Sequence, residues 1–414
     1  MIGRYVRAVA SQGVVSAFHF VLNIALIRLL EPAEYGLFAL VFAVAFIVAS
    51  VSNALFTVPL SVLRPGSPED QQTVLEQKLT TPALVFGAAA AMFTLLASIL
   101  LSGTEATLLG TSAGLFIATF LVRTHARGAG YSRFDASAVL RADLVYVVAA
   151  ASTIVAVFWL WPTARVAWVL FLALSAANLA SIVTMTPRNT VGRILSARLL
   201  QNYEPYWVHA RWALLGAVST MLAAQGHSLV ISLVKGAESF APIAAGFALL
   251  GPARVLFGTI QNVLRPEMAR TLNEGQRQTA HRQALFASAG MVAVVLGLAG
   301  FVAVFWNVIS TQLYEDRYGD EPMGTIVAYW VVATLVAATA TGPNALLQAL
   351  MRFRSLSLVG VGGAIVGLSL VTIAVLTTSV PTTILAVAAA EATMAVGTFW
   401  LLLRKKMLRV EARP

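Results

Sequence analysis

The pentapeptide "SVLRP" at 61–65 recurs as "NVLRP" at 262–266, which lies 201 residues further along the chain. Each copy ends a long apolar stretch and opens a polar segment. A second match pairs Ala33-Glu34 with Ala237-Glu238, at a separation of 204 residues. The two matches are collinear, and their difference of three residues is explained by one small insertion. The sequence therefore predicts that the chain contains two copies of one unit.

The composition places both copies in a membrane. Hydrophobic residues make up 58% of the chain and charged residues 11%, and the mean hydropathy is +0.81. A soluble protein carries roughly 25% charged residues, and a soluble core could not absorb this much apolar surface. The chain has no cysteine, which excludes disulfides and thiolate metal sites. It also has no H-E-x-x-H motif and no G-x-x-x-x-G-K-[ST] loop. We therefore expect no metal, no cofactor and no ATP hydrolysis.

The hydropathy pattern contains twelve windows suited to a spanning helix of about 20 residues. They fall at 9–29, 37–61, 81–102, 105–122, 142–161, 166–185, 210–234, 240–262, 284–309, 325–350, 355–377 and 382–403. Pro59 and Pro343 lie inside long windows, so we expect kinks there. The sequence thus predicts an all-α polytopic membrane protein with twelve transmembrane helices.

The repeat groups these helices into two lobes of six. Arg133-Phe134 after the fourth window corresponds to Arg352-Phe353 after the tenth. Because six is even, both lobes have the same orientation, and a pseudo-two-fold axis along the membrane normal relates them. We expect an N-lobe, an amphipathic cytoplasmic connector, a C-lobe and a basic tail. These parts cover 1–185, 186–209, 210–403 and 404–414.

The basic residues set the orientation of the chain. Of the 28 lysines and arginines, 23 lie on one set of alternate loops and at the termini, four lie on the other set, and Arg254 lies inside a span. Cytoplasmic loops carry the excess of basic residues, so we expect both termini in the cytoplasm. This bias accounts for the net charge of +10, and nucleic acid is not expected as a partner.

Polar side chains inside the spans are candidates for a substrate cavity, because they are costly in lipid unless they face protein or water. Two helical stripes stand out, formed by Gln12, Ser16, His19 and Asn23 and by Ser50, Asn53, Thr57 and Ser61. In the repeat, Asn23 matches His227 and Asn53 matches Arg254. These side chains either line a cavity shared by the lobes or hydrogen-bond between helices.

Arg254 is the strongest candidate because it lies deep in the eighth span, where burial of an arginine costs about 2.5–3.5 kcal/mol. Gly251-Pro252 just before it predicts a kink that opens the backbone. We expect Arg254 to face a wet cavity and to bind phosphate, which a guanidinium holds with two hydrogen bonds. Arg28, at the outer end of the first span, is either a phosphate contact on the exit side or an interface anchor.

Three polar residues of the second lobe have two interpretations each. Glu391, among alanines of the twelfth span, is either a proton-coupling carboxylate or a buried, hydrogen-bonded acid. Asn344 and Gln348 share a face of the tenth span beside Pro343, and they contact either sugar or a neighbouring helix. We expect no catalytic residue.

The loop between the first two spans carries a Leu-x-Pro-x-Glu-Tyr-Gly pattern, formed by Leu30, Pro32, Glu34, Tyr35 and Gly36. This loop resembles that of bacterial polysaccharide flippases of the Wzx type. They belong to the MOP superfamily, which also holds the MATE exporters and the lipid II flippase. The resemblance implies two lobes around a central cavity. It also implies alternating-access export of an undecaprenyl-pyrophosphate-linked oligosaccharide to the periplasmic leaflet of the bacterial inner membrane, for lipopolysaccharide or exopolysaccharide synthesis.

The partners implied by this resemblance are the lipid-linked oligosaccharide, membrane lipids, and the polymerase and chain-length proteins of polysaccharide synthesis.

A cation-coupled drug or metabolite antiporter of the same fold is the first alternative. It would need an acidic residue deep in the first lobe, and we expect Asp143 only at the cytoplasmic mouth of the fifth span. A membrane polysaccharide polymerase or ligase would need a catalytic acid or a large outer loop, and the outer loops are short. A major-facilitator sugar transporter would carry an Asp-Arg-rich signature that the loop after the second span lacks. We therefore favour a flippase, which is a transporter and not an enzyme.

Overall fold

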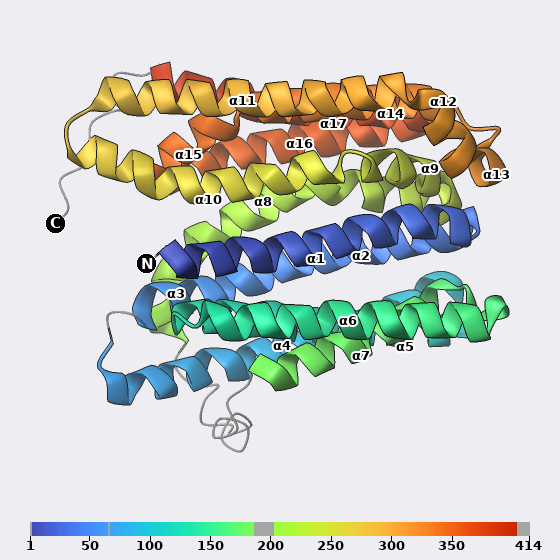
Figure 1. The fold of residues 1–414 in the computed structure, drawn as a ribbon, viewed down its shortest axis with the longest axis horizontal. Helices are drawn as coiled ribbons and strands as arrows, with labels where there is room; N and C mark the ends of the chain where they lie inside the picture. Colours follow the sequence, from blue (N-terminus) through green and yellow to red (C-terminus); the bar gives the residue numbers. More distant parts are fainter. Residues whose placement is uncertain (1, 65–66, 186–202, 404–414) are drawn as a thin grey trace. The chain divides into compact units, whose positions relative to one another are not determined.

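The computed structural model describes residues 2–64, 67–185 and 203–403, and these residues form helices and no strand (Figure 1). Eleven helices are long and apolar enough to span a membrane. The bent pair α9 and α10 makes a twelfth if its two helices form one span. The prediction of an all-α membrane protein with twelve spans is confirmed. The predicted tail, and residues 186–202 of the predicted connector, lie outside the described residues.

The first six spans run from α1 to α7. Their bounds are α1 (Ile2–Leu29), α2 (Pro32–Ser52) with its continuation α3 (Val58–Leu63), α4 (Glu69–Ser102), α5 (Thr107–Ser132), α6 (Ala136–Leu160) and α7 (Ala167–Met185). A π-helical turn, η1 (Asn53–Thr57), joins α2 to α3. The 3-10 turns η3 (Thr104–Ala106) and η4 (Pro162–Ala164) precede α5 and α7.

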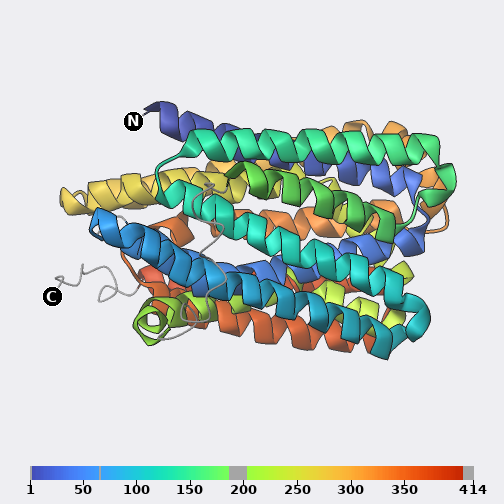
Figure 2. The ribbon, with the colours of Figure 1, turned by 90° about the horizontal axis from the view of Figure 1, so that it is seen from below.

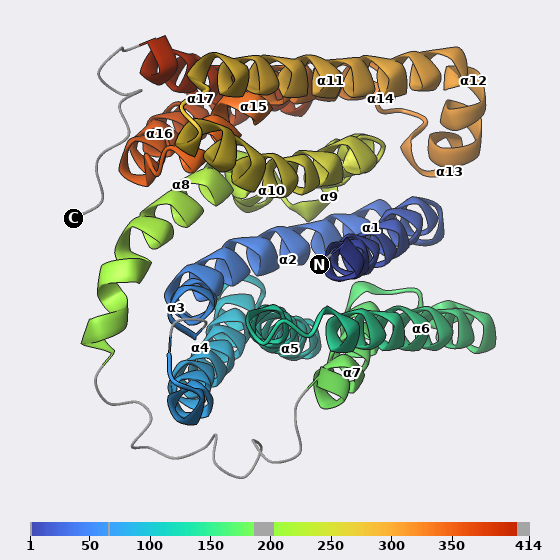
Figure 3. The same cartoon turned by 60° about the vertical axis from the view of Figure 1, so that its left-hand side comes forward.

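The second six spans run from α8 to α17. Their bounds are α8 (Glu204–Lys235), α9 (Ala237–Ala248) with α10 (Gly251–Asn273), α11 (Arg277–Val304), α14 (Met323–Thr339) with α15 (Thr341–Ala349), α16 (Phe353–Thr377) and α17 (Thr383–Leu403). The short elements α12 (Trp306–Ile309), η7 (Ser310–Tyr314) and α13 (Glu315–Tyr318) form a hook at the end of α11 (Figure 3). The 3-10 turn η8 (Val380–Thr382) leads into α17.

Contacts divide the chain into two compact units, one of Met1–His19 and Val41–Leu214 and one of Phe20–Leu40 and Leu215–Pro414. In the first unit α5 packs against α4 and α7, and α6 packs against α7; Figure 2 shows α4 and α5 side by side. In the second unit α14 packs against α11 and α17, and α16 packs against α17. The third to sixth spans of each half therefore pack in the same order. The predicted lobes assign the segment Phe20–Leu40 to the first half, whereas its contacts group it with the second unit.

The turns after the fourth and tenth spans have the same backbone. Phe134 and Met351 both have a φ of 59°, the left-handed region that is strained for any residue with a side chain. In both turns the next residue donates its N–H to a carbonyl five residues earlier, which is the Schellman helix end. The backbone therefore matches Phe134 to Met351, two positions before the Phe353 suggested by the sequence comparison.

The fourth span is longer than predicted. The hydropathy window ends at 122, whereas α5 continues to Ser132. Arg123 and Arg127 therefore belong to a helix and not to a cytoplasmic loop, and the side chain of Arg123 is only 3% exposed. Asp143, which was expected at the mouth of the fifth span, is completely buried in α6. The predicted window ended before Arg123 because a hydropathy scale counts every charged residue as if it had no counter-charge.

Spans are interrupted where the sequence places proline. Kinks were predicted at Pro59 and Pro343, and the regular α-helix is interrupted near both, since η1 precedes Pro59 and Ala340 separates α14 from α15. The pair α9 and α10 bends by 68° just before Gly251-Pro252. A proline favours such interruptions because it lacks an N–H and because its ring clashes with the preceding turn.

Hydroxyls from elsewhere in the fold reach two carbonyls affected by these prolines. Pro59 has no N–H for the carbonyl of Leu55, and the hydroxyl of Tyr203 donates to that carbonyl. Burial raises the pKa of Tyr203 to about 12, so this hydroxyl remains a donor at neutral pH. In the second unit the hydroxyl of Ser288 donates to Thr339, four residues before Pro343, at 2.7 Å. At these two prolines the carbonyl that lacks the proline N–H is thus paired with a hydroxyl, and pairing of backbone groups is what a membrane requires.

Candidate functional site

Two groups of enclosed charges within the described spans bear on function, one in each unit. The predicted site residues are likewise divided between the units: His19 and Asn53 lie in the first, and Asn23, Arg28, His227, Arg254, Asn344, Gln348 and Glu391 lie in the second. We call the two places the Arg254 site, in the second unit, and the Asp143 site, in the first.

The Arg254 site is built at the bend between α9 and α10. Gly251 and Pro252 occupy the first turn of α10, where proline is tolerated because that turn lacks N–H partners. Arg254 follows within the same turn, so its charge lies beside the positive end of the helix dipole. The bend therefore presents a guanidinium and a helix N-terminus at one place.

The guanidinium of Arg254 is mostly enclosed and only weakly paired. Its Nη2 lies 3.5 Å from Oε1 of Glu391 in α17, which is the long limit for a hydrogen bond. Its centre lies 4.8 Å from the ring centre of Phe247 and 6.0 Å from that of Trp330. The Arg254 side chain is 18% exposed, and its Nε is buried with no hydrogen-bond partner among the described residues. The arginine thus has N–H groups left to bind an anion.

Aromatic side chains hold α9 in place beside the bend. The indole N–H of Trp330 donates to the carbonyl of Ile243 at 2.9 Å, and the hydroxyl of Tyr314 donates to Ala245 at 3.2 Å. The ring centre of His227 lies 5.3 Å from that of Trp330. These contacts fix the end of α9, and so they fix the direction in which α10 begins.

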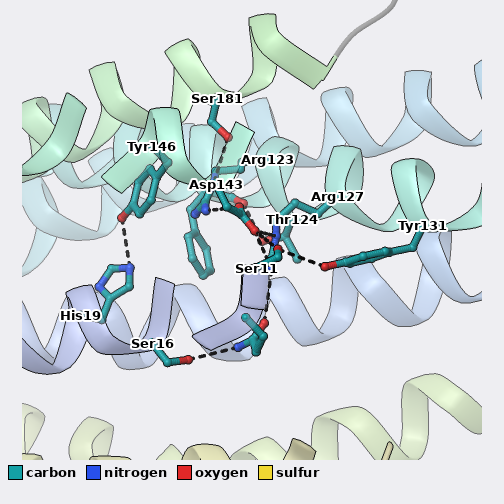
Figure 4. A network of polar contacts seen from close by, with 12 residues as sticks. Ser11, Ser16, His19, Arg123, Thr124, Arg127, Tyr131, Asp143, Tyr146 and Ser181 are labelled. Carbon is teal, nitrogen blue, oxygen red and sulfur yellow. Dashed lines mark hydrogen bonds and ion pairs between the residues drawn. The ribbon is translucent and has the colours of Figure 1, made fainter. Parts of the chain in front are cut away.

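The Asp143 site was not predicted, and its contacts are shown in Figure 4. Oδ1 of Asp143 accepts from Nη2 of Arg123 at 2.6 Å, and Oδ2 lies 3.0 Å from Nη2 of Arg127. Oδ2 also accepts a hydrogen bond from the hydroxyl of Ser11. Both oxygens of the carboxylate therefore already contact an arginine, and two positive charges beside it disfavour a bound cation.

Arg123 has further contacts that fix its position. Its guanidinium lies 3.7 Å from the ring centre of Tyr146, and its Nε donates to Ser181 at 3.2 Å. The hydroxyl of Tyr146 forms a hydrogen bond with Nε2 of His19 at 3.0 Å. The predicted cavity residue His19 is thereby connected to the Asp143 site.

The other predicted residues have separate surroundings. Asn344 accepts from Thr398 of α17 at 3.1 Å, an interhelical hydrogen bond. Asn23 accepts from Tyr35 at 3.4 Å. Of the predicted residues, Arg254 and Glu391 are brought together by a described contact. Arg28 is exposed, and its Nη2 lies 4.0 Å from Oδ2 of Asp316. Asn53 is exposed at the start of η1, and Gln348 is half-buried in α15.

The Leu-x-Pro-x-Glu-Tyr-Gly pattern has a packing role in the second unit. Leu30 and Tyr35 are buried. A Cβ at Gly36 would overlap the backbone carbonyl of Ala237. The first turn of α2 can approach α9 this closely because position 36 has no side chain. Ala237 is also the residue that the repeat pairs with Ala33.

The loop at 314–322, between α11 and α14, is anchored by buried side chains although its sequence is acidic. Tyr314 and Tyr318 are buried, which raises the pKa of both hydroxyls. Arg317 pairs with Glu31 at the start of α2. Within the second unit this loop therefore holds the segment that carries the sequence pattern.

No protein-family model and no curated protein sequence matches this chain. Among solved structures, it is similar to a multidrug resistance transporter of the MATE family in an inward-facing conformation. The identity is 12%, with 97% of this chain and 98% of the other covered and a TM-score of 0.71. The chain has the MATE fold. The same fold is found in a MOP superfamily transporter from Pyrococcus furiosus, at 11% identity, with 98% and 96% of the chains covered and a TM-score of 0.69. That transporter is described as having a binding pocket of reversed polarity that suggests a different function.

Proposed function

We propose that the protein exports an anionic, undecaprenyl-pyrophosphate-linked oligosaccharide from the cytoplasmic to the periplasmic leaflet of the bacterial inner membrane by alternating access. Its MATE fold and its multiple apolar spans support a membrane exporter. The sequence pattern at 30–36 supports the polysaccharide branch of the superfamily. Both termini lie in the cytoplasm in this proposal, and the partners are membrane lipids and the polymerase and chain-length proteins of the same pathway.

The proposal depends most on the Arg254 site. A phosphate group needs N–H donors and positive charge, and Arg254 offers both with its Nε unused. The adjacent start of α10 adds the positive end of a helix dipole. Broken helices in transporters use their half-helix N-termini in this way, to meet anionic substrate groups.

Glu391 acts as the resting counter-ion of Arg254. An unpaired buried charge is costly, so the carboxylate stabilises the arginine while no substrate is bound. Arg254 and Glu391 form a single contact, and its N···O distance of 3.5 Å is long for an ion pair. A phosphate can instead accept two short hydrogen bonds from a guanidinium. An arriving pyrophosphate therefore replaces Glu391 and leaves that carboxylate to take up a proton or to turn toward solvent.

Moving a glycan head group across the membrane requires polar side chains along the spans. Each unpartnered hydroxyl moved into hydrocarbon costs roughly 2–7 kcal/mol, and a pyrophosphate costs far more. Amides, hydroxyls and an arginine remove most of this cost, while the polyprenyl tail remains in lipid. The inside-negative membrane potential adds about 2.3 kcal/mol per exported negative charge per 100 mV.

A cation-coupled drug antiporter is the second candidate, because the first unit does contain a buried acid. Asp143 is completely buried, but two arginines and a serine occupy its oxygens. The positive charge of Arg254 favours an anion. The reversed pocket polarity reported for the Pyrococcus furiosus transporter supports the idea that this fold can serve a substrate of different charge.

The test is glycan export in cells that depend on this protein. Arg254→Ala should abolish surface glycan and accumulate the lipid-linked precursor, at an unchanged amount of protein in the membrane. Arg270→Ala is the matched control, because Arg270 lies on the same helix and is 82% exposed. Normal export by Arg254→Ala would show that Arg254 has no role in transport. The main support for an anionic substrate would then be lost.

A further inference from the structure

The Asp143 site carries more positive than negative charge. Arg123 and Arg127 both contact the single carboxylate of Asp143. Arg123 is closed to a ligand, because its side chain is only 3% exposed, pairs with Asp143, donates to Ser181 and stacks on Tyr146. Arg127 is therefore the surplus cation of the cluster.

Arg127 lies on the accessible side of this cluster. The exposed fraction of the side chain rises from 0% at Asp143 to 3% at Arg123 and 17% at Arg127. Nε and Nη2 of Arg127 face Asp143, and Nη2 also donates to Oε1 of Gln12 at 3.2 Å. Nη1 makes no hydrogen bond within the described part of the chain. Two N–H groups of a partly enclosed guanidinium are thus available to a ligand.

Further donors lie beside Arg127 on α1. The amide nitrogen of Gln12 lies 3.4 Å from the hydroxyl of Ser16, and Gln12 is exposed. Gln12 thereby connects Arg127 to Ser16 along one face of α1, next to the Asp143 contacts in Figure 4. A guanidinium, an amide and a hydroxyl can all donate to one group of oxygens.

We propose that Arg127, Gln12 and Ser16 form a second anion site that binds a phosphate group, with Asp143 as the residue that positions Arg127. Asp143 holds the guanidinium by Nε and Nη2, so the Nη1 edge points away from the carboxylate. The phosphate is either the pyrophosphate of the exported lipid or the phosphodiester of an anionic membrane lipid. The first source rests on the proposed function, whereas the second does not.

The binding test uses the purified full-length protein in phosphatidylcholine nanodiscs, with inorganic pyrophosphate as the soluble probe and thermal unfolding as the readout. Pyrophosphate should stabilise the wild type, and Arg127→Gln should weaken its apparent affinity by about tenfold. Arg141→Gln, which removes an exposed arginine of α6, should leave the affinity unchanged. Arg127→Lys, which keeps the charge, should recover part of the binding.

A second arm distinguishes the lipid source. Native mass spectrometry after reconstitution with phosphatidylglycerol should show one retained anionic lipid fewer in Arg127→Gln than in Arg141→Gln if a membrane lipid occupies the site. Pyrophosphate binding without lipid retention assigns the site to the substrate head group. If Arg127→Gln binds both probes as the wild type does, the site does not exist.

The positioning role of Asp143 has its own readout. Asp143→Glu should retain the Arg127-dependent part of pyrophosphate binding, and Asp143→Asn should lose that part even in preparations that remain folded by gel filtration. Arg254→Gln separates this proposal from the proposed function, because it should abolish export and leave the Arg127-dependent part of pyrophosphate binding intact. Loss of all pyrophosphate binding in Arg254→Gln, with none lost in Arg127→Gln, would refute the second site and leave the exporter proposal standing.

Discussion

Substitution of Ser288 by alanine should test how the tenth span tolerates its proline. The Ser288 hydroxyl donates to the carbonyl of Thr339 at 2.7 Å and accepts from the N–H of Gly342 at 3.1 Å. Thr339 is the residue whose carbonyl would receive the N–H that Pro343 lacks. The hydroxyl therefore serves two backbone groups at the break between α14 and α15.

The magnitude follows from the number of groups left unpaired. An unsatisfied buried donor or acceptor costs about 1–3 kcal/mol, so loss of both contacts should destabilise the protein by about 2–6 kcal/mol. An ordinary interhelical hydrogen bond in a membrane protein contributes only about 0.6 kcal/mol on average. Loss of stability on Ser288→Ala should therefore be several-fold larger if the hydroxyl pairs the backbone groups at the break than if it forms an ordinary interhelical hydrogen bond.

The assay is equilibrium unfolding in mixed micelles, and Ser175→Ala is the matched control. Ser175 is also buried, and its hydroxyl donates to Phe171, one helical turn earlier in the same helix. This substitution should cost less than about 1 kcal/mol, because the carbonyl keeps its helical N–H partner. In a Pro343→Ala background, which restores the missing N–H, the effect of Ser288→Ala should shrink.

Equal effects of Ser288→Ala and Ser175→Ala would refute this account of the break. The same conclusion would follow if Pro343→Ala left the effect of Ser288→Ala unchanged, because the hydroxyl would then not be compensating for the proline.

Three further substitutions test other parts of the structure. Asp143→Asn should lower the unfolding free energy by about 3–5 kcal/mol, because it leaves the buried guanidinium of Arg123 and the partly buried one of Arg127 without their carboxylate. A loss below about 1 kcal/mol in urea unfolding would show that the cluster is well solvated. Gly36→Ala should lower the free energy of unfolding by about 1–3 kcal/mol, since the new Cβ would overlap the carbonyl of Ala237. Gly13→Ala is the control, because the space around Gly13 is open and its thermal unfolding should be little changed. Phe134→Gly should raise the midpoint of thermal unfolding by relieving about 1 kcal/mol of left-handed strain; an unchanged or lower midpoint would mean that the exposed ring contributes more than the strain costs.

The sequence was sufficient for the architecture because lipid imposes a simple rule on each span. Twelve apolar windows predicted the spans, and Pro59, Pro343 and Gly251-Pro252 predicted the interruptions, since each acts on its own helix. The repeated "VLRP" pattern predicted two equal sets of six. These inferences needed no knowledge of which helices are neighbours.

The Asp143 site could not be found in this way because it depends on contacts between helices. Arg123 and Arg127 are four residues apart, so they lie on one face of a helix, but hydropathy assigned both to a loop. Their partner Asp143 lies on the next helix and Ser11 on the first. A charge becomes acceptable in a span when its counter-charge is adjacent in space, and a single sequence does not reveal that adjacency.

The Arg254 site was found in part. Its position beside Gly251-Pro252 was enough to predict a buried arginine at a bend. Its pairing with Glu391, 137 residues away, was not. The predicted interpretations of Arg254 as a phosphate ligand and Glu391 as a coupling acid now belong to one pair and can be tested together.

The most direct test of the central claim is transport by the purified protein in liposomes. The wild type should move a fluorescent polyprenyl-pyrophosphate-linked oligosaccharide between leaflets, Arg254→Gln should not, and Arg270→Gln should. A cationic dye should not move under a proton gradient. Dye transport without lipid movement, or lipid movement that is unaffected by Arg254→Gln, would contradict that claim.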